Sequence, residues 1–365
     1  MAIQMRWLEQ GEIPLGQHYV RTLWNSSHIL ARDEALFAWQ YKPVAGDSRL
    51  GFLIAEDAGH PVGCIGRMPI YCHIHGHPVP GAAIALLVTD PAYRHGAVGV
   101  TLLKQAYEGL KLVITMGINS HVAKLYRMLG QHVVPAMPRY VCRGSTEILA
   151  AMWAACKADT PFPEERYQAC PALLMPTSPV SGWRCEALTE ESLEEWDDCW
   201  RQILAPVRQG TVKDAATLRW RYIEHPNFTY DAFLARDPQK KVCGLAVLRH
   251  IPLPGGVEAV RIMEFIAKDK DASQMLVRGV ADRVPYNTAF VECVCLGSDW
   301  NPLHTLGLSG QGADLFSVCF NPPDFSRCGI MAAFASTVPG LSPACFVTDP
   351  STYLTVADGD QDRPN

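Results

Sequence analysis

The alternation of apolar and polar residues over roughly the first third of the chain predicts strands followed by two helices. Two alternating stretches are joined by a turn at Gly59-His60-Pro61, and a third turns at Gly76 into a longer apolar strand. The expected strands cover 50–56, 62–68, 70–74, 82–88 and 112–116, and the expected helices cover 101–110 and 120–129. The pattern therefore predicts a sheet with helices packed against it.

The same order of elements returns in the second half of the chain, offset by about 181 residues. The segments 36–41, 52–57, 62–65 and 84–90 correspond to 217–222, 233–237, 242–245 and 262–268. A strand at 260–267, a helix to Val284, a strand at 288–296 and a short helix at 300–306 complete the second copy. Duplication of one unit explains this correspondence.

Chain length and proline content predict two domains and a connection between them. A chain of 365 residues exceeds one typical core. The expected parts are an N-terminal domain over 1–145, a helix and proline-rich linker over 146–183, a second domain over 184–349 and an acidic tail over 350–365. The tail should be a solvated, frayed end of the chain, with a role in ligand binding as the alternative.

Charge and hydropathy limit the classes of binding partner that we expect for this protein. The 32 basic and 37 acidic residues leave a net charge of −5, which argues against a broad nucleic-acid surface. No apolar run is long enough to span a membrane, and the first residues lack a signal-peptide pattern. We therefore expect a cytoplasmic monomer or homodimer with no membrane or nucleic-acid partner.

The cysteines are expected to be free thiols. Their number, 13, is odd, and the chain is long for a disulfide-stabilised scaffold. No Cys-x-x-Cys occurs, and Cys293 and Cys295 alternate within an expected strand, so the sequence does not predict a zinc site. Cys72 and Cys142 lack the surrounding pattern of a catalytic nucleophile.

The stretch from Val88 to Gly99 is the strongest candidate for a ligand-binding loop. It follows an apolar strand directly and leads into a helix. Amides at a helix N-terminus are unpaired donors with partial positive charge, so they can bind a polyanion without a row of lysines. Gly96 and Gly99 would let the backbone approach phosphate groups closely.

The helix at 120–129 carries a second candidate residue, Tyr126. It precedes the pair Leu129-Gly130 and shares a helical face with Val122 and Leu125. The phenol could therefore be a proton donor, or its ring could be a packing residue of that face.

Together, the loop and the tyrosine helix resemble the GNAT superfamily of N-acyltransferases. Arg94, Gly96 and Gly99 resemble the family's Arg-x-x-Gly-x-Gly/Ala loop for acyl-CoA, with Ala97 where the family usually has its first glycine. The expected order of elements is also the family's order. The resemblance implies an α/β fold of two tandem GNAT-like units, each a mixed, mostly antiparallel sheet flanked by helices.

The resemblance implies acyl-CoA as the co-substrate, with no metal. The residues expected to bind it are Leu87 and Val88 along the pantetheine arm, Arg94, His95, Gly96, Ala97, Val98, Gly99 and Val100 around the pyrophosphate, and Asn119 at the next helix entry. Tyr126 would protonate the CoA thiolate while an amine attacks the thioester directly. A phenol of pKa about 10 facing a thiol of about 8.5 makes a full proton transfer about 2 kcal/mol uphill.

The base that would receive the amine proton is not obvious from the sequence. Many GNAT enzymes place a glutamate in the strand before the loop, whereas 82–88 contains none. His73, which alternates with His75 and His77, is one candidate. Glu264, in the corresponding strand of the second copy, is another.

The tandem layout suggests a class of acceptor. Trp-x-Tyr at Trp39 and Trp220 and the acidic tail resemble bacterial N-acyltransferases that modify nucleotide-linked amino sugars for surface polysaccharide. This resemblance implies transfer of an acetyl or hydroxybutyryl group to a dTDP- or UDP-amino sugar. An acyltransferase for an amino acid, antibiotic or peptide amine, and a CoA-binding protein without catalysis, remain alternatives. The second copy lacks a glycine in 267–273, so CoA is expected only in the first.

Overall fold

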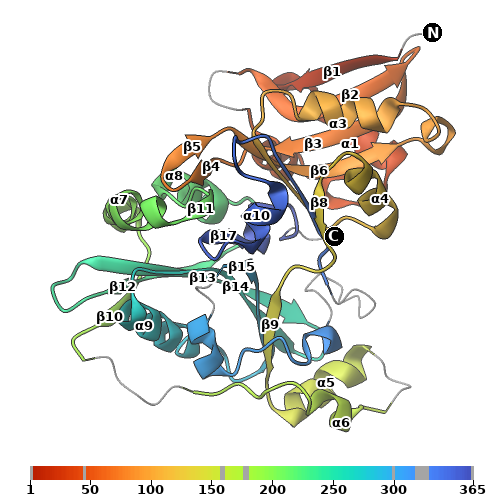
Figure 1. Cartoon of the computed structure of the whole chain (residues 1–365). Helices are drawn as coiled ribbons and strands as arrows, with labels where there is room; N and C mark the ends of the chain where they lie inside the picture. Colours follow the sequence, from red (N-terminus) through yellow and green to blue (C-terminus); the bar gives the residue numbers. More distant parts are fainter. Residues whose placement is uncertain are drawn as a thin grey trace.

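The computed structural model describes residues 3–43, 47–156, 161–175, 181–297, 301–316 and 329–362, and these form two lobes, each built on its own sheet (Figure 1). Pro176 and Pro179 of the expected linker, Trp300 of the expected helical piece and residues 363–365 of the tail lie outside the described residues.

The first sheet is mixed, with mostly antiparallel neighbours. In spatial order it contains β1 (Gln4–Glu9), β2 (Arg49–Asp57), β3 (His60–Met68), β6 (Gly81–Thr89), β7 (Leu112–Met116), β16 (Ala332–Ser336) and β8 (His132–Val134). Only β6 and β7 run parallel among these neighbours. The helices that accompany this sheet are α1 (Ile13–Leu23), α2 (Glu34–Gln40), α3 (Val98–Ala106) and α4 (Ser120–Met128).

The second sheet follows the same principle. Its order is β10 (Arg184–Ala187), β12 (Asp231–Arg236), β13 (Val242–Leu253), β14 (Val257–Ala267), β15 (Thr288–Leu296), β17 (Thr352–Thr355), β11 (Gln209–Thr211), β4 (Cys72–Ile74) and β5 (His77–Val79), with β9 (Arg139–Arg143) also paired to β15. Its parallel pairs are β14 with β15 and β11 with β17.

Helices lie against both sheets, which confirms the expected fold class. The remaining α-helices are α5 (Thr146–Cys156), α6 (Glu164–Tyr167), α7 (Glu190–Cys199), α8 (Ala215–Leu218), α9 (Lys270–Ala281) and α10 (Pro343–Thr348). Short 3-10 or π turns are η1 (Gln10–Glu12), η2 (Ile29–Ala31), η3 (Pro91–Tyr93), η4 (Trp200–Leu204), η5 (Ala205–Val207), η6 (Arg219–Ile223), η7 (Asn301–Leu306), η8 (Ala313–Leu315) and η9 (Val356–Asp358). The helix expected to reach Val284 ends at Ala281.

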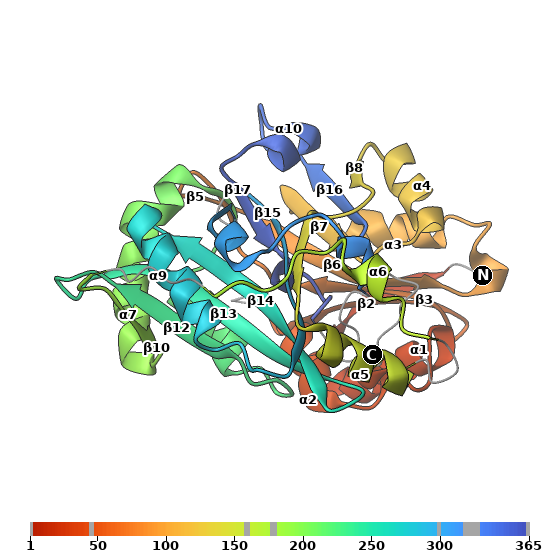
Figure 2. The same ribbon diagram turned by 90° about the horizontal axis from the view of Figure 1, so that it is seen from below.

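The two sheets exchange strands across the expected domain boundaries. β9, which the sequence assigns to the first domain, pairs antiparallel with β15 of the second sheet. β16, which the sequence assigns to the second domain, lies between β7 and β8 of the first sheet, as Figure 2 shows for the blue strand beside β7. The hairpin β4–β5 also crosses over and pairs with β11. Each sheet is therefore completed by segments from the other part of the chain.

The acidic tail is buried, so the expectation of a solvated end is wrong. Residues 352–362 are all buried, and the described end of the chain lies between the two lobes (Figure 1). Asp358 accepts a hydrogen bond from Lys213, and Asp362 forms an ion pair with Arg249. A buried carboxylate is tolerated where a cation and hydrogen bonds meet it, and both conditions hold here.

The described part of the expected linker, 161–175, is also folded. It contains α6, and the side chains of Tyr167 and Cys170 are buried in an apolar cluster with Phe290 and Phe316. The prolines therefore mark turns of a packed segment at these positions. Every described cysteine is a free thiol.

A pair of tryptophans joins the lobes with the symmetry expected of a repeat. The Trp39 indole N–H donates to the Trp220 carbonyl at 2.9 Å, and the Trp220 indole donates back to the Trp39 carbonyl at 3.3 Å. Because equivalent residues contact each other reciprocally, this contact has the form of a two-fold interface. Among the described residues, no helix is long and apolar enough to cross a bilayer.

Candidate active site

The strands β6 and β7 diverge and leave an open edge. They pair from Gly81 opposite Leu112 to Ile84 opposite Thr115. Past Ile84, β6 continues to Thr89 and pairs only with β3, on its other side, among the described residues. The amides that follow β7, those of Gly117 and Ile118, bond instead to the Met331 carbonyl. The far half of β6 therefore offers backbone groups to an extended ligand.

A bulge lies in the middle of this open edge. The register between β3 and β6 shifts between Cys64 and Gly66, opposite Leu86 and Leu87. Leu86 has φ +56°, a left-handed conformation that costs a non-glycine residue roughly 1–2 kcal/mol. Bulges of this kind re-aim the backbone next to functional sites.

The loop after β6 presents the uncapped N-terminus of α3. Asp90 fixes the turn η3 by accepting a hydrogen bond from the Ala92 amide at 2.8 Å. Residues 94–97 are exposed, and α3 then begins at Val98. Its N-cap residue, Ala97, makes no side-chain cap hydrogen bond. The first amides of α3 are therefore available to an anion.

Close packing accounts for the glycines of this loop. Neither Gly96 nor Gly99 has a positive φ, but a Cβ at Gly99 would lie 3.2 Å from Thr89 Oγ1. Ala97 has φ −83°, which any residue adopts. Ala97, the residue that departs from the GNAT pattern, therefore causes no backbone strain.

Two side chains hold the loop against the sheet. The Tyr93 hydroxyl donates to Asp57 at 2.8 Å, and Arg94 Nε donates to the Thr89 carbonyl at 3.2 Å. Arg94 is exposed, and Val98 is buried below it in the apolar cluster of α3. The loop thus has a fixed base and an exposed polar rim.

A small pocket opens between the diverging strands, with a volume of about 100 Å³. Its lining residues come from β6 and β7, from α4, from the end of α1 and from the tail: Ile84, Ala85, Leu86, Leu87, Thr115, Met116, Gly117, Ile118, Asn119, Val122, Tyr126, Trp24, Asp360 and Gln361. The structure therefore brings Tyr126, Asn119 and Leu87, three of the expected site residues, around one cavity.

The Tyr126 phenol is buried, with 1% of its surface exposed. Burial raises its pKa well above the ordinary value of 10, and the nearby Tyr107 and Asp360 raise it further, against a smaller opposing effect of Thr115. The phenol therefore stays protonated. A full proton transfer to a thiolate would cost more than the 2 kcal/mol expected for an ordinary tyrosine, so hydrogen-bond donation is the less costly role.

Asn119 has a structural task at the start of α4. Its Oδ1 accepts hydrogen bonds from the amides of His121 and Val122 at 3.0 and 2.9 Å. This capping occupies the side-chain carbonyl. The side-chain NH₂ is the group through which Asn119 could contact a ligand.

His73 lies away from this pocket. It is 3% exposed on β4, where its Nδ1 accepts from the Gly76 amide at 3.3 Å and its ring meets the edge of Trp200. Burial lowers its pKa to about 4, with further lowering by neighbouring cationic groups. The structure thus separates His73 from Tyr126. Among the described residues, no three His, Cys, Asp or Glu side chains gather to hold a metal ion.

Glu264 is also separate from the pocket, in a buried polar cluster of the second lobe. Lys213 donates to its carboxylate, as do the hydroxyls of Tyr222 at 2.6 Å and Tyr353 at 2.9 Å. Its oxygens are therefore engaged by the protein's own groups, as expected of a structural carboxylate.

In the second lobe, the protein's own side chains occupy the positions that correspond to the open edge of β6 and the start of α3. The Tyr353 hydroxyl accepts from the Phe265 amide of β14 at 2.9 Å. Asp269 caps α9 by accepting from the Ala272 amide at 2.9 Å, and its carboxylate would repel phosphate. Both contacts support the expectation that CoA binds only the first lobe.

Among the pocket residues that the sequence did not anticipate, three come from outside the segment 84–126: Trp24, Asp360 and Gln361. A signal for the tail was nevertheless present. Asp358, Asp360 and Asp362 alternate as in a strand, and Arg249 interrupts an apolar strand, 242–253, that contains no carboxylate. A buried arginine requires an acidic partner, and the tail supplies Asp362 to Arg249, whereas Arg261 pairs mainly with Glu292 of β15.

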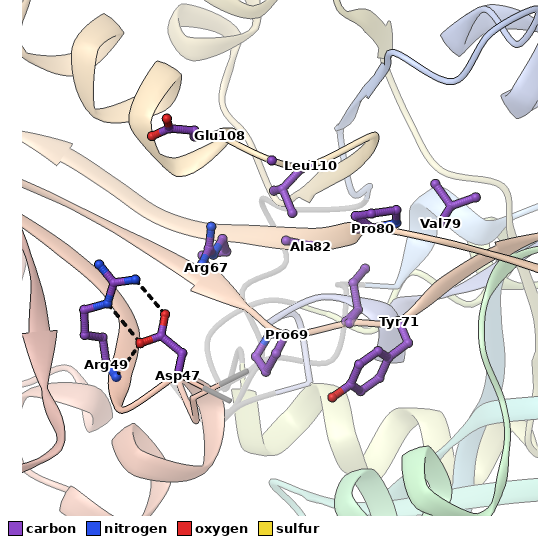
Figure 3. Close-up of a pocket in the computed structure, with 13 residues that line it drawn as sticks. Asp47, Arg49, Arg67, Pro69, Tyr71, Val79, Pro80, Ala82, Glu108 and Leu110 are labelled. Atoms are coloured by element: carbon purple, nitrogen blue, oxygen red, sulfur yellow. Dashed lines mark hydrogen bonds and ion pairs between the residues drawn. The ribbon is translucent and has the colours of Figure 1, made fainter. Parts of the chain in front are cut away.

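A larger pocket, of about 510 Å³, lies at the opposite end of β6, near Pro80, Gly81 and Ala82 (Figure 3). Its charged side chains Asp47 and Arg49 bond to each other at 2.8–2.9 Å. None of the residues expected at the site lines it. We therefore place the candidate site at the diverging end of the strand.

Comparison with known sequences identifies the segment that contains the loop and the tyrosine helix. Residues 17–130 match the profile of a family described as "Acetyltransferase (GNAT) family". A search of curated proteins finds no match. The matched segment begins in α1 and ends just after α4, so it covers most of the first sheet and the whole of the loop.

Solved structures share the fold over most of the chain. A GCN5-related N-acetyltransferase of Anabaena variabilis is 13% identical with a TM-score of 0.53, over 80% of this chain and 65% of that one. A probable N-acyltransferase of Enterococcus faecalis is 13% identical with a TM-score of 0.56, over 91% and 72%. Saccharomyces cerevisiae N-myristoyltransferase, solved with bound myristoyl-CoA, is 12% identical with a TM-score of 0.54, over 92% and 79%. At these identities the likeness shows the fold alone. The chain spans less than two thirds of the Anabaena protein's length.

Proposed function

From the match of residues 17–130 to the profile of the GNAT acetyltransferase family, we propose that the protein transfers a short acyl group from acyl-CoA to the amine of a small acceptor. One observation carries the proposal. The uncapped N-terminus of α3 stands at the end of an unpaired strand edge, and a pocket lined by Tyr126 opens along that edge.

Groups of this chain are placed so that they could bind each part of acyl-CoA. The amides of Val98, Gly99 and Val100 would hold the pyrophosphate, with Arg94 at the exposed rim. The backbone of Leu87 and Val88 would pair with the amide-containing pantetheine arm as an added strand. Acyl-CoA would supply the activated thioester carbonyl.

The pocket residues would then stabilise the negative charge that develops on the thioester oxygen and sulfur during the reaction. A backbone amide near Leu87 would donate to the carbonyl oxygen, and the Tyr126 phenol would donate to the departing sulfur. Because Tyr126 is buried, its hydrogen bond to the sulfur would form where water is largely excluded and such bonds are strong.

The size of the pocket favours a short acyl chain. Its volume of about 100 Å³ is small against the roughly 300–1,000 Å³ of typical ligand sites. An acetyl group would fit within it more easily than a hydroxybutyryl group. We therefore place acetyl-CoA first among the donors.

The acceptor that we place first is a nucleotide-linked amino sugar. This choice rests on the resemblance of the tandem layout to enzymes for such sugars, and the reciprocal contact of Trp39 with Trp220 supports a duplicated unit. We propose that the second unit has lost CoA binding and contributes to the acceptor side of the pocket.

Thiol release provides the test. Purified protein is incubated with acetyl-CoA or hydroxybutyryl-CoA and with dTDP- and UDP-amino sugars, amino acids and aminoglycosides, and free CoA is measured. We expect release with acetyl-CoA and an amino sugar. A nucleoside diphosphate should then raise the melting temperature, which it would not do for an amino-acid or antibiotic acyltransferase. CoA binding without release from any acceptor would favour the CoA-binding protein, and no CoA binding would exclude the proposal.

A further inference from the structure

The buried tail contributes the end wall of the pocket between β6 and β7. Asp360 and Gln361 both line it, together with Tyr126. Gln361 Nε2 donates to the Met116 carbonyl at 3.3 Å and to Asp360 Oδ1 at 2.6 Å. A Cβ at Gly117 would lie 2.4 Å from that nitrogen, so glycine is what admits the Gln361 side chain. The tail is thus fitted to the end of β7.

The second lobe holds the tail on either side of Asp360. Arg221 donates to the Gly359 carbonyl at 3.1 Å, and Arg261 Nη1 lies 3.4 Å from the Gln361 carbonyl. The flanking carboxylates are neutralised by buried cations, Asp358 by Lys213 and Asp362 by Arg249. These contacts fix the backbone of the tail from the side opposite the pocket.

Asp360 brings a carboxylate to the pocket, and the other described lining residues carry none. The strand before the loop contains no acidic residue, and His73 and Glu264 lie outside the pocket. Among the described residues that line the pocket, Asp360 is the one carboxylate. It is 6% exposed, so its charge acts at short range on whatever enters beside Tyr126.

We propose that Asp360 is the group that meets the acceptor amine and takes its proton, and that the second lobe serves to hold it there. This inference rests on the proposed function. The N–C bond forms as the C–S bond breaks. Before attack, the acceptor ammonium gives one proton to the Asp360 carboxylate, which releases it to solvent. On attack, the nitrogen gives its second proton to the same carboxylate, and the sulfur gains one from Tyr126. Transfer from Asp360 to Tyr126 through solvent restores both groups, so the products are the amide and CoA thiol.

The test compares Asp360→Asn with the unsubstituted chain. Asparagine keeps the size of the side chain and an oxygen that can accept from Gln361. With the amine acceptor found in the thiol-release assay, we expect turnover to fall by about 10²–10⁴-fold. Acetyl-CoA affinity, measured by calorimetry, and melting temperature should stay close to those of the unsubstituted chain. Glu108→Gln, at an exposed position outside the site, should leave turnover unchanged.

An acceptor analogue separates proton removal from a structural role. A hydrazide or hydroxylamine group in place of the amine is already neutral at pH 7, so Asp360→Asn should slow its acylation much less. Asp360→Ser provides a second variant if asparagine prevents folding. Full turnover in either folded variant, or equal loss with both acceptors, would overturn this inference alone. No turnover in the unsubstituted protein would overturn the proposed function, and this inference with it.

Discussion

At the scale of single residues, Tyr126 combines burial with access to the ligand pocket. Its neighbours on α4 pack as an apolar face would, yet its side chain lines the cavity between the diverging strands. The packing role and the proton-donor role, which the sequence leaves open as alternatives, are therefore compatible. Because burial raises the phenol's pKa far above 10, Tyr126 would donate a hydrogen bond over the whole physiological pH range.

Tyr126→Phe should lower turnover with little change in acyl-CoA affinity. The substitution removes the donor to the sulfur but keeps the ring that packs in α4. We expect kcat to fall by about 10²-fold or more and KM for acetyl-CoA to change by less than about threefold. Steady-state kinetics provide the measurement.

Tyr107→Phe is the matched control for that experiment. This phenol is also shielded from solvent, but it accepts a hydrogen bond from Gln131 and does not line the pocket. Turnover close to that of the unsubstituted protein is expected. If Tyr126→Phe behaves like this control, Tyr126 is a packing residue only.

The candidate residues that the sequence predicts have local signals, whereas the pocket residues of the tail depend on distant pairing. The loop from Arg94 to Gly99 and the position of Tyr126 are carried by a dozen consecutive residues each, so a short pattern suffices. Asp360 reaches the pocket only because Lys213 and Arg249 hold the tail more than a hundred positions away along the chain. A short sequence pattern does not show ion pairs between such distant residues, and a terminal acidic stretch is ordinarily solvated.

At the scale of elements, the two lobes differ at one helix N-terminus. α3 begins with an alanine and no side-chain cap, whereas α9 begins with Asp269, which caps its first turn. An uncapped start leaves amides for a ligand, at a cost in helix stability that is typically about 1 kcal/mol. The contrast favours the first lobe as the place of the proposed anion site.

Ala97→Asp should weaken CoA binding through charge. A carboxylate beside the amides of α3 would repel the pyrophosphate at short range, and we expect at least a tenfold loss of affinity, about 1.4 kcal/mol. Calorimetric titration with CoA measures it. Binding of S-acetylpantetheine, which has no pyrophosphate, should not change.

Ala97→Asn provides the uncharged control at the same position. It has nearly the size of aspartate and can cap the same amides without a charge, so it should lose less affinity for CoA than Ala97→Asp. An equal loss in both variants would mean that capping or bulk, and not charge, matters at residue 97. A loss for S-acetylpantetheine as well would place the pyrophosphate elsewhere.

At the scale of the whole molecule, buried titratable groups connect the lobes. His73 belongs to a hairpin from the first half of the chain that pairs with β11. Burial lowers its pKa to about 4 from an ordinary 6.5. Between these two values the unfolded chain binds a proton that the folded protein excludes, so the free energy of unfolding falls as the pH is lowered from 6.5 towards 4.

Replacing His73 with glutamine should flatten this pH dependence. The contribution of His73 amounts to at most about 3 kcal/mol across the interval. Urea unfolding at pH 7, 5.5 and 4.5 checks it: the unsubstituted protein should lose more stability than His73→Gln. His60→Gln, at the exposed start of β3, should follow the unsubstituted protein. Parallel curves for His73→Gln and the unsubstituted chain would contradict the assignment.

The sheet pairing also shows where sequence patterns reach their limit. Strand positions such as 82–88 and 112–116 follow from apolar runs, and the structure has β6 and β7 there. The partners of β9 and β16 do not follow, because any buried strand matches any exposed edge in pattern alone. The domain boundary expected at residue 145 follows the order of elements along the chain. Strand pairing depends instead on which sheet edges have no neighbouring strand.

The exchange of strands has a consequence for biosynthesis. The edge of β7 can be covered only after residues 332–336 have been made, so the sheet beside Tyr126 stays incomplete until that segment has emerged from the ribosome. A fragment that stops near residue 145 would expose that edge and associate with other chains. Nascent protein is therefore expected to depend on chaperones late in translation, and the two halves to mature together.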